Sequence, residues 1–188
     1  MPAGDGPRVP VWGLALRLVH WGLAIAVGIA WITHHGPPWL HDGAGYAALA
    51  LVLLRLIGGA VGGERERFAG FVAGPRATLS YAGRIVAGAE PRFLGHNPLG
   101  GWMIVALLAA TAGAGLTGWL FTTDRYWGVQ WVAILHSVLA DLLLALIALH
   151  VAGVAFTSVR QGENLVTAML HGRKPRTTSR HPEPPADA

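Results

Sequence analysis

Apolar residues along the chain gather into four long runs that are separated by polar segments. The runs cover residues 11–33, 39–63, 99–121 and 131–158 and contain few charged residues. Each has about the 20 residues that an α-helix needs to cross a hydrocarbon core of roughly 30 Å. The pattern therefore predicts an all-α membrane protein, a bundle of four transmembrane helices.

The polar segments between the runs predict how the helices connect. Residues 34–38 form a short turn that contains Gly36 and two prolines, so the second helix should return antiparallel to the first. The longer segment, residues 64–93, contains Pro75–Val86, in which Leu79 and Ile85 alternate with Arg76 and Arg84. This pattern is typical of an amphipathic helix that lies at the membrane interface, here between the second and third transmembrane helices.

Polar segments at both ends flank the membrane domain. We expect residues 1–10 to be a polar N-terminal leader and residues 11–161 to be the four-helix transmembrane domain. Residues 162–188 are polar and, from residue 173 onward, rich in proline and charge. They predict a cytoplasmic tail that is largely disordered, because such a segment buries too little apolar surface to fold.

Composition agrees with a bilayer environment and predicts the orientation. Hydrophobic residues make up 53% of the sequence and charged residues 13%, against roughly 25% charged in soluble domains. The net charge of +4 comes from basic residues spread over loops, which membrane topology explains without a nucleic-acid partner. On one side of the membrane, the predicted loops contain a single basic residue, Arg125. The other basic residues of the loops and termini lie on the opposite side. We therefore expect a multi-pass membrane protein, surrounded by membrane lipid, with both termini cytoplasmic.

Histidine is the residue type that points to chemistry. The sequence has no cysteine, which excludes thiolate-bound clusters and covalent haem attachment. Of nine histidines, His20, His136 and His150 lie inside apolar runs and His41 begins one. His136 and His150 are fourteen residues apart, which places them on nearly the same helix face and about 21 Å apart along the axis.

Matching depths in the bilayer group these histidines into two pairs. His20 should lie at the cytoplasmic level of His150, and His41 at the outer level of His136. Two imidazoles on one haem iron leave no open position, which favours electron transfer over oxygen binding. Two alternatives remain open. Histidines in membrane helices also serve as packed, hydrogen-bonded residues, and a zinc or copper site would instead collect its ligands around one ion.

Three charged residues inside the runs are further candidates. Arg55 lies fourteen residues after His41 and should share its helix face at the inner level. Arg17 lies about one turn before His20. Each of these arginines could contact a haem propionate or a quinone oxygen. Alternatively, each side chain could extend to the cytoplasmic headgroups. Asp141 should point away from both His136 and His150, so that it either relays protons or hydrogen-bonds a neighbouring helix.

The chain resembles the prokaryotic cytochrome b561 family, which includes the cytochrome b subunits of nickel–iron hydrogenases. The resemblance extends from Val11 to about Lys174. It rests on Arg17 and His20-Trp21, Leu40-His41 with Gly45-Tyr46, Gly95-His96-Asn97-Pro98-Leu99-Gly100, Leu135-His136, Leu149-His150 with Gly153, Glu163-Asn164-Leu165 and Gly172-Arg173-Lys174. The family implies two haems b with bis-histidine ligation by His20, His41, His136 and His150, and electron exchange with a quinone.

Together these observations predict transmembrane electron transfer between the quinone pool and a redox partner on the outer side. The partner would be a periplasmic c-type cytochrome or a small molecule such as superoxide, and the protein would then act as a quinone oxidoreductase of the respiratory chain. The alternative is a non-catalytic membrane anchor and redox adaptor of a hydrogenase or dehydrogenase complex. Hydrogenase subunits carry more sequence than this chain, which favours a stand-alone member or one paired with a c-type cytochrome.

Overall fold

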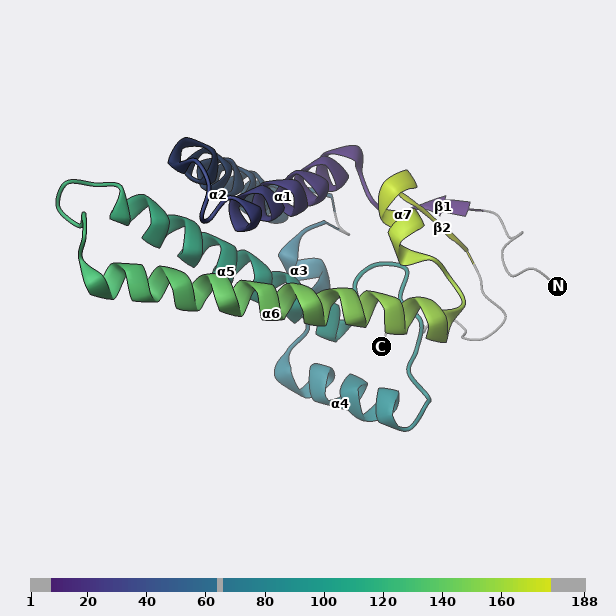
Figure 1. The fold of residues 1–188 in the computed structure, drawn as a ribbon. Coiled ribbons are helices and arrows are strands. Elements are labelled where there is room, and N and C mark those ends of the chain that lie inside the picture. The colour runs from purple at the N-terminus through teal and green to yellow at the C-terminus, as the bar shows by residue number, and fades with distance from the viewer. Residues whose placement is uncertain (1–7, 64–65, 177–188) are drawn as a thin grey trace. The chain divides into compact units, whose positions relative to one another are not determined.

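A computed structural model describes residues 8–63 and 66–176, and most of these are helical (Figure 1). The elements in chain order are β1 (Arg8–Pro10), α1 (Leu14–Ile32), α2 (Pro38–Val61), α3 (Phe68–Phe71), α4 (Pro75–Val86), α5 (Pro98–Phe121), α6 (Gln130–Gln161), α7 (Leu165–His171) and β2 (Arg173–Pro175).

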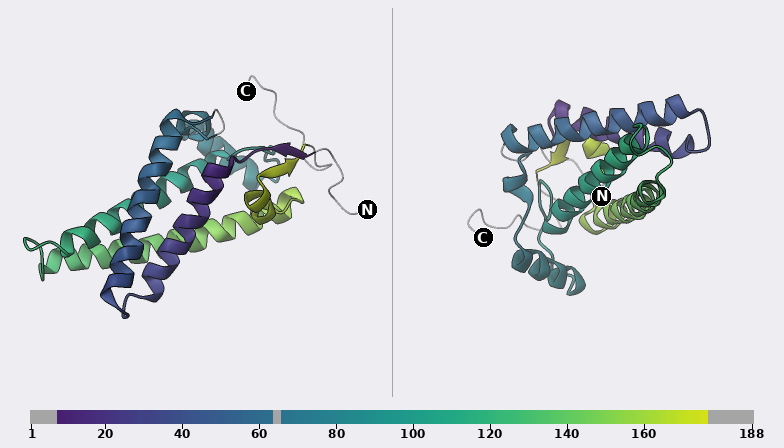
Figure 2. Two further views of the ribbon diagram at one scale, coloured as in Figure 1. Left: turned by 90° about the horizontal axis from the view of Figure 1, so that it is seen from above. Right: turned by 90° about the vertical axis from the view of Figure 1, so that its left-hand side faces the viewer.

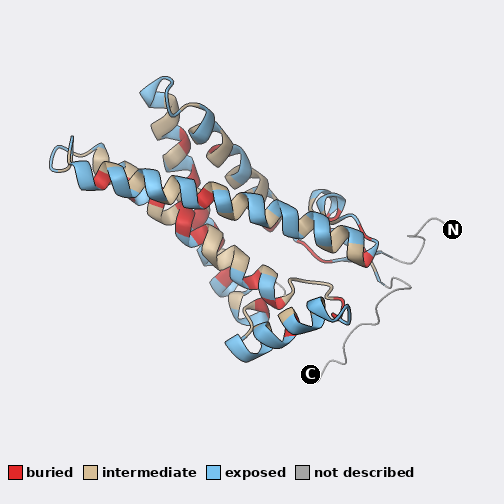
Figure 3. Cartoon of the chain, turned by 60° about the horizontal axis from the view of Figure 1, so that its bottom comes forward, coloured by how far each residue is buried: buried red, intermediate tan, exposed pale blue. Residues whose placement is uncertain are grey.

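Four helices, α1, α2, α5 and α6, are long and apolar enough to cross a membrane. Most of their residues are exposed or half-buried in the isolated chain (Figure 3). The exposed positions include large apolar side chains such as Ile32 and Leu149, which lipid rather than water would cover. The prediction of four membrane-spanning helices is confirmed. Their bounds agree within a few residues, and α6 continues to Gln161, three residues beyond the predicted end.

Helix α4 covers the predicted residues, Pro75–Val86. Gly74 precedes it and Pro75 occupies its first turn, where the missing N–H costs no helical hydrogen bond. Tyr81 is buried and packs edge-on against Phe93, with ring centroids 5.5 Å apart. Leu79 and Val86 are exposed. Its location at the membrane interface stays a prediction.

The chain divides into two compact units, which are described separately here. Unit 1 comprises Met1–Arg17, Gly59–Ile104 and Leu149–Ala188, within the described residues. Unit 2 comprises Leu18–Gly58 and Val105–Ala148. Unit 2 therefore contains most of α1 and α2, together with the parts of α5 and α6 that are joined by the loop of residues 122–129.

Unit 1 joins the two ends of the described chain in a small antiparallel sheet (Figure 2). Val9 of β1 lies opposite Lys174 of β2. Helix α7 begins where the Asn164 side chain accepts a hydrogen bond from Thr167 N at 2.9 Å, and ends at Gly172 with φ 75°. Strand pairing orders residues 8–10, which were expected in the leader. Strand pairing and the helix caps order residues 164–175, which were expected in the disordered tail. Residues 1–7 and 177–188 lie outside the described residues.

A buried ion network lies beside this sheet in unit 1. Arg92 Nη2 donates to Glu163 Oε2 at 2.8 Å and to the Pro175 carbonyl at 2.8 Å. Lys174 Nζ donates to Glu163 Oε1 at 3.2 Å. The three side chains are only 2–4% exposed. Burial lowers the pKa of the Lys174 ammonium, and the Glu163 carboxylate opposes that shift.

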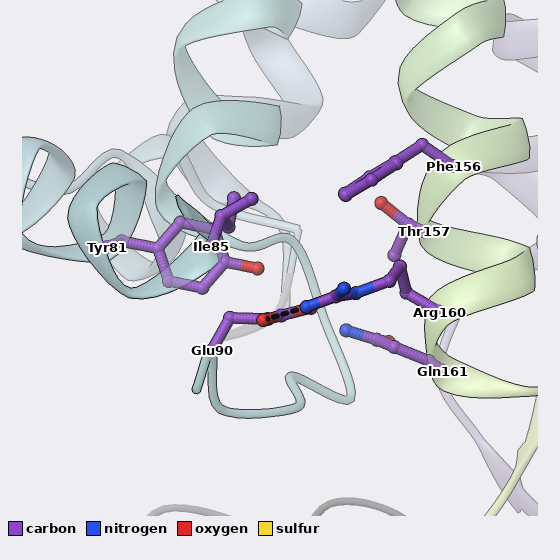
Figure 4. Close-up of a pocket in the computed structure, with 7 residues that line it drawn as sticks. All are labelled: Tyr81, Ile85, Glu90, Phe156, Thr157, Arg160 and Gln161. Atoms are coloured by element: carbon purple, nitrogen blue, oxygen red, sulfur yellow. Dashed lines mark hydrogen bonds and ion pairs between the residues drawn. The ribbon is translucent and has the colours of Figure 1, made fainter. Parts of the chain in front are cut away.

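A second ion pair connects the end of α6 to the segment after α4. Arg160 donates from Nε and Nη2 to the two carboxylate oxygens of Glu90, at 2.9 and 2.8 Å (Figure 4). Tyr81 and Ile85 line the same small pocket, so α4 packs beside the end of α6. Burial, and secondarily the Glu90 charge, raises the pKa of Tyr81 to about 12, while a hydrogen bond with Asn97 acts to lower it.

Small residues bring the helices of unit 2 into close contact. A Cβ at Gly22 of α1 would lie 3.1 Å from Leu51 of α2, and one at Gly113 of α5 would lie 3.1 Å from Leu139 of α6. A Cβ at Gly115 would come within 2.6 Å of Leu49. Since real side chains do not approach so closely, α2 and α5 pack at this separation only because residue 115 is glycine.

Candidate functional site

Unit 2 encloses a cavity of about 520 Å³ between residues of α1, α2, α5 and α6. Its size lies within the range of roughly 300–1,000 Å³ that is typical of ligand and cofactor sites. Mostly apolar and small residues line it, among them Val27, Ala48 and Leu144. The polar lining residues include His41 and His136, two of the four predicted ligands. The cavity is therefore the place where the chemistry of unit 2 should be sought.

The structure brings His41 of α2 and His136 of α6 together on this cavity. Their ring centroids are 6.0 Å apart and the ring planes are inclined at 78°. With metal–nitrogen bonds of about 2 Å, and roughly 1 Å from each nitrogen to its ring centre, rings on opposite sides of one metal ion have centres about 6 Å apart. The observed separation therefore suits two axial ligands of one iron.

Each of these imidazoles is held through its Nδ1 atom. His41 Nδ1 lies 2.8 Å from the carbonyl oxygen of Ala30 in α1. His136 Nδ1 lies 2.9 Å from the carbonyl oxygen of Ala114 in α5 and 3.3 Å from Thr117 Oγ1. Because a carbonyl oxygen only accepts, each neutral ring must carry its proton on Nδ1. Nε2 then has the lone pair that binds a metal.

This anchoring is the usual second contact of a metal-bound histidine. Metal-binding imidazoles commonly donate their other N–H to a backbone carbonyl, which fixes the tautomer and the ring orientation. Among the described residues, neither His41 nor His136 makes a hydrogen bond through Nε2. No cluster of three or more His, Cys, Asp or Glu that could hold a metal ion occurs in the described ranges. The donor set thus fits two-ligand haem binding rather than a zinc site.

Gly118 shapes the side of the cavity on which His136 lies. A Cβ at this position would be 3.1 Å from Cε1 and 3.3 Å from Nδ1 of the His136 ring. Only a glycine lets the ring lie against α5 at this separation without moving. Glycines inside membrane helices leave room for close contacts, and Gly118 makes room for the proposed ligand itself.

The other predicted site residues are distributed over both units. His20 and Arg55 belong to unit 2, where Arg55 is buried in α2. His150 and Arg17 belong to unit 1. The His20–His150 pair is therefore formed by residues of different units and stays a prediction. Arg17 has a partner that the sequence did not indicate, because its guanidinium donates from Nη1 to the Leu170 carbonyl of α7.

Several cavity residues were not selected from the sequence. His34 and Asp42 both line the cavity, and the Tyr46 hydroxyl lies 3.1 Å from Thr122 Oγ1 at the same wall. Asp141 also lines it. The prediction that Asp141 points away from His136 is corrected, because both residues line the same cavity. The cavity is broad enough to contact two adjacent rows of α6 side chains, so both residues reach it.

The motif at residues 95–100 organises unit 1. Asn97 Oδ1 accepts a hydrogen bond from Gly100 N at 2.7 Å at the start of α5. The His96 ring lies beside Trp12, with centroids 4.4 Å apart, and beside Phe71, with centroids 4.8 Å apart. His96 thus lies among aromatic side chains that connect three segments of unit 1.

Comparisons with known proteins identify the family of the chain. A family model described as prokaryotic cytochrome b561 matches residues 11–172, which include all seven helices of the described chain. No curated protein and no solved structure matches the chain. The match covers well over half of the sequence and contains the four predicted histidine ligands. The chain belongs to the prokaryotic cytochrome b561 family, multi-pass membrane proteins that transfer electrons through haem b.

Proposed function

We propose that the protein carries electrons across the bacterial inner membrane through two b-type haems, between the quinone pool and a redox partner on the outer side. His41 and His136 would hold the outer haem, and His20 and His150 the inner one. The arrangement of His41 and His136 is the observation that carries this proposal. Both rings lie on one cavity at a separation suited to a shared iron, and both are oriented through Nδ1.

Helix α6 supports the presence of a second haem. It is continuous from Gln130 to Gln161 and carries both His136 and His150. A separation of fourteen residues corresponds to about 21 Å along the helix axis, which is about two thirds of a hydrocarbon core of roughly 30 Å. A second iron bound at His150 would therefore lie near the opposite membrane surface, as transfer across the bilayer requires.

Buried polar atoms in α1 give the inner site further support. Nε of Arg17 and Nε1 of Trp21 are buried and have no hydrogen-bond partner among the described residues. Trp21 directly follows His20. Because a buried N–H without a partner costs about 1–3 kcal/mol, such groups are expected where a ligand supplies the acceptor. A haem propionate or a quinone oxygen would satisfy them, and the buried guanidinium of Arg55 would add a positive charge on α2.

Bound haem b would supply a carrier that changes charge by one electron. The residues of the chain would keep the iron six-coordinate, exclude water from its surroundings and hold the imidazoles in one tautomer. Oxidation of a quinol to a quinone also releases two protons, which water or side chains of the protein would have to accept. Asp42 and Asp141 on the outer cavity are titratable groups in a position to exchange protons there.

Single substitutions of the four ligands test the assignment. His20→Ala, His41→Ala, His136→Ala and His150→Ala should each purify with one haem per chain instead of two. The His41 and His136 variants should lose the same haem, and the other two variants should lose the second. His35→Ala is the matched control, because His35 lies in the loop between α1 and α2 and is not one of the proposed ligands. The assignment fails if His41→Ala or His136→Ala retains both haems.

A role as membrane anchor and redox adaptor is the second candidate. It is favoured by the short connections of residues 33–37 and 122–129, which offer little surface for recognising a substrate. Purification from native membranes in mild detergent separates the two functions. An adaptor should copurify with a catalytic subunit and show no quinone turnover alone, whereas a stand-alone quinone oxidoreductase should exchange electrons with a quinol analogue when purified.

A further inference from the structure

The two imidazoles on the unit 2 cavity are anchored differently. His41 Nδ1 contacts one acceptor, the Ala30 carbonyl at 2.8 Å. His136 Nδ1 lies near two, the Ala114 carbonyl at 2.9 Å and the Thr117 hydroxyl at 3.3 Å. The difference arises from one side chain of α5, because Thr117 has no counterpart beside His41 among the described residues.

The hydroxyl of Thr117 is itself fixed. Its oxygen lies 2.8 Å from the Gly113 carbonyl and 3.0 Å from the Ala114 carbonyl, and the residue is buried. The hydroxyl has one hydrogen, which it donates to these carbonyls, so its lone pairs face other donors. The Nδ1–H of His136 is the donor within reach. The Nδ1–H of His136 is therefore shared between two acceptors, the Thr117 hydroxyl oxygen and the Ala114 carbonyl oxygen. The Thr117 hydroxyl in turn donates its own hydrogen toward the Ala114 carbonyl.

We propose that Thr117 is a positioning residue for the haem ligand His136, and that it sets both the plane of this imidazole and the reduction potential of the iron it binds. This inference rests on the proposed function. An acceptor on Nδ1–H increases the electron donation of the opposite nitrogen to the metal, which stabilises the ferric state. The same contact, with the close approach of Gly118 on α5, limits rotation of the ring and maintains its 78° inclination to His41.

The chain offers a matched control on the same helix. Thr111 is as buried as Thr117 and also donates to the carbonyl four residues earlier, Leu107, at 2.7 Å. Unlike Thr117, it lines the cavity, so its variant also measures what the loss of a wall hydroxyl does by itself. Its hydroxyl makes no contact with either His41 or His136. Thr111→Val and Thr117→Val remove the same atom from the same helix, and they differ in whether that atom faces a proposed ligand. Thr117→Ser keeps the hydroxyl and removes only the methyl group.

The test compares these three variants with the wild type as full-length, haem-loaded proteins. Electron paramagnetic resonance of the oxidised protein reports the angle between axial ring planes, because near-perpendicular imidazoles give ferric haem a strongly anisotropic signal. Thr117→Val should shift this signal for one haem of two and move its potential to more positive values. Thr117→Ser should restore both. Thr111→Val should keep the wild-type ring-plane signal, because its hydroxyl contacts neither imidazole. Loss of one haem in Thr117→Val alone would also support the proposal, since removing such a contact costs about 10–100-fold in metal affinity.

The inference is overturned if Thr117→Val keeps the wild-type spectrum and potentials, or if Thr111→Val shifts them equally. Should Thr117→Val fail to fold, Thr117→Ala, which removes the hydroxyl and the methyl group together, is judged by the same two readouts. Failure of the proposed function looks different, because the wild type itself would then bind fewer than two haems.

Discussion

Polar side chains are satisfied in opposite ways in the two units. In unit 1, Arg92 and Lys174 are neutralised by Glu163, and Arg160 is neutralised by Glu90. In unit 2, His41 and His136 are each held by backbone carbonyls through one nitrogen, while the other nitrogen has no hydrogen bond within the described ranges. Charged groups that neutralise one another indicate a structural role. Two imidazoles on one cavity, each with a hydrogen bond at only one nitrogen, indicate a binding site for a ligand.

The largest effect on stability should come from the network of unit 1. Glu163→Gln would leave Arg92 and Lys174 as buried cations without a counter-ion, and breaking such a pair costs about 3–5 kcal/mol. Asp124→Asn makes the same chemical change at an exposed loop position and should cost little. Thermal unfolding of both variants in detergent checks this difference. Equal midpoints would show that the network is not needed for the stability of unit 1.

The next effect should come from the cavity wall of unit 2. Gly118→Val places a side chain where a Cβ alone would be 3.1 Å from the His136 ring. Overpacking of this kind costs about 1–3 kcal/mol, and it should displace the imidazole and weaken or remove the low-spin signal of one haem. Gly28→Val is the control, because a Cβ at Gly28 meets nothing within 4 Å. An unchanged spectrum in Gly118→Val would contradict the proposed position of His136 as a ligand.

Helix α4 gives a test of a different kind, because lipid rather than protein should cover its outer side. Val86 is 91% exposed and Leu79 is 73% exposed, and the helix carries Arg76 and Arg84 without any acidic residue. The chain has no cysteine, so Val86→Cys and Ser80→Cys allow a single dye at either position. In vesicles with brominated lipid chains, the dye at residue 86 should be quenched more strongly than the dye at residue 80. Equal quenching would argue against an interfacial helix that inserts Leu79 and Val86.

The smallest effect concerns the phenol of Tyr81. Its pKa in the folded chain, about 12, lies above the ordinary value of 10.0, so the folded state holds this proton more tightly than the unfolded state. The stabilisation is complete below pH 10 and should be lost as the pH rises from about 10 to about 12. Tyr81→Phe should remove this alkaline dependence, whereas Tyr126→Phe should keep it. Absorbance titration and thermal unfolding across this range measure both.

Much of this architecture follows from local sequence patterns. The four membrane spans are visible as long apolar runs, and helix Pro75–Val86 is visible as an amphipathic pattern. The spacing of fourteen residues selects His136 and His150. Thr117 could not be selected, because a threonine in an apolar helix usually bonds its own backbone, as Thr111 does. Lys174 is also hidden, since a lysine in a proline-rich segment indicates an exposed tail. Its burial depends on Arg92 and Glu163, and pairing between distant segments leaves no local pattern.

The account depends most directly on the cofactor content of the wild-type protein. The measurement is the reduced-minus-oxidised visible spectrum of the purified full-length chain, together with haem and protein assays on the same sample. We expect two haems b per chain, both low-spin in the oxidised and the reduced states, because two imidazoles occupy both axial positions of each iron. One haem per chain, or a high-spin component that binds added carbon monoxide, would contradict the paired-histidine assignment.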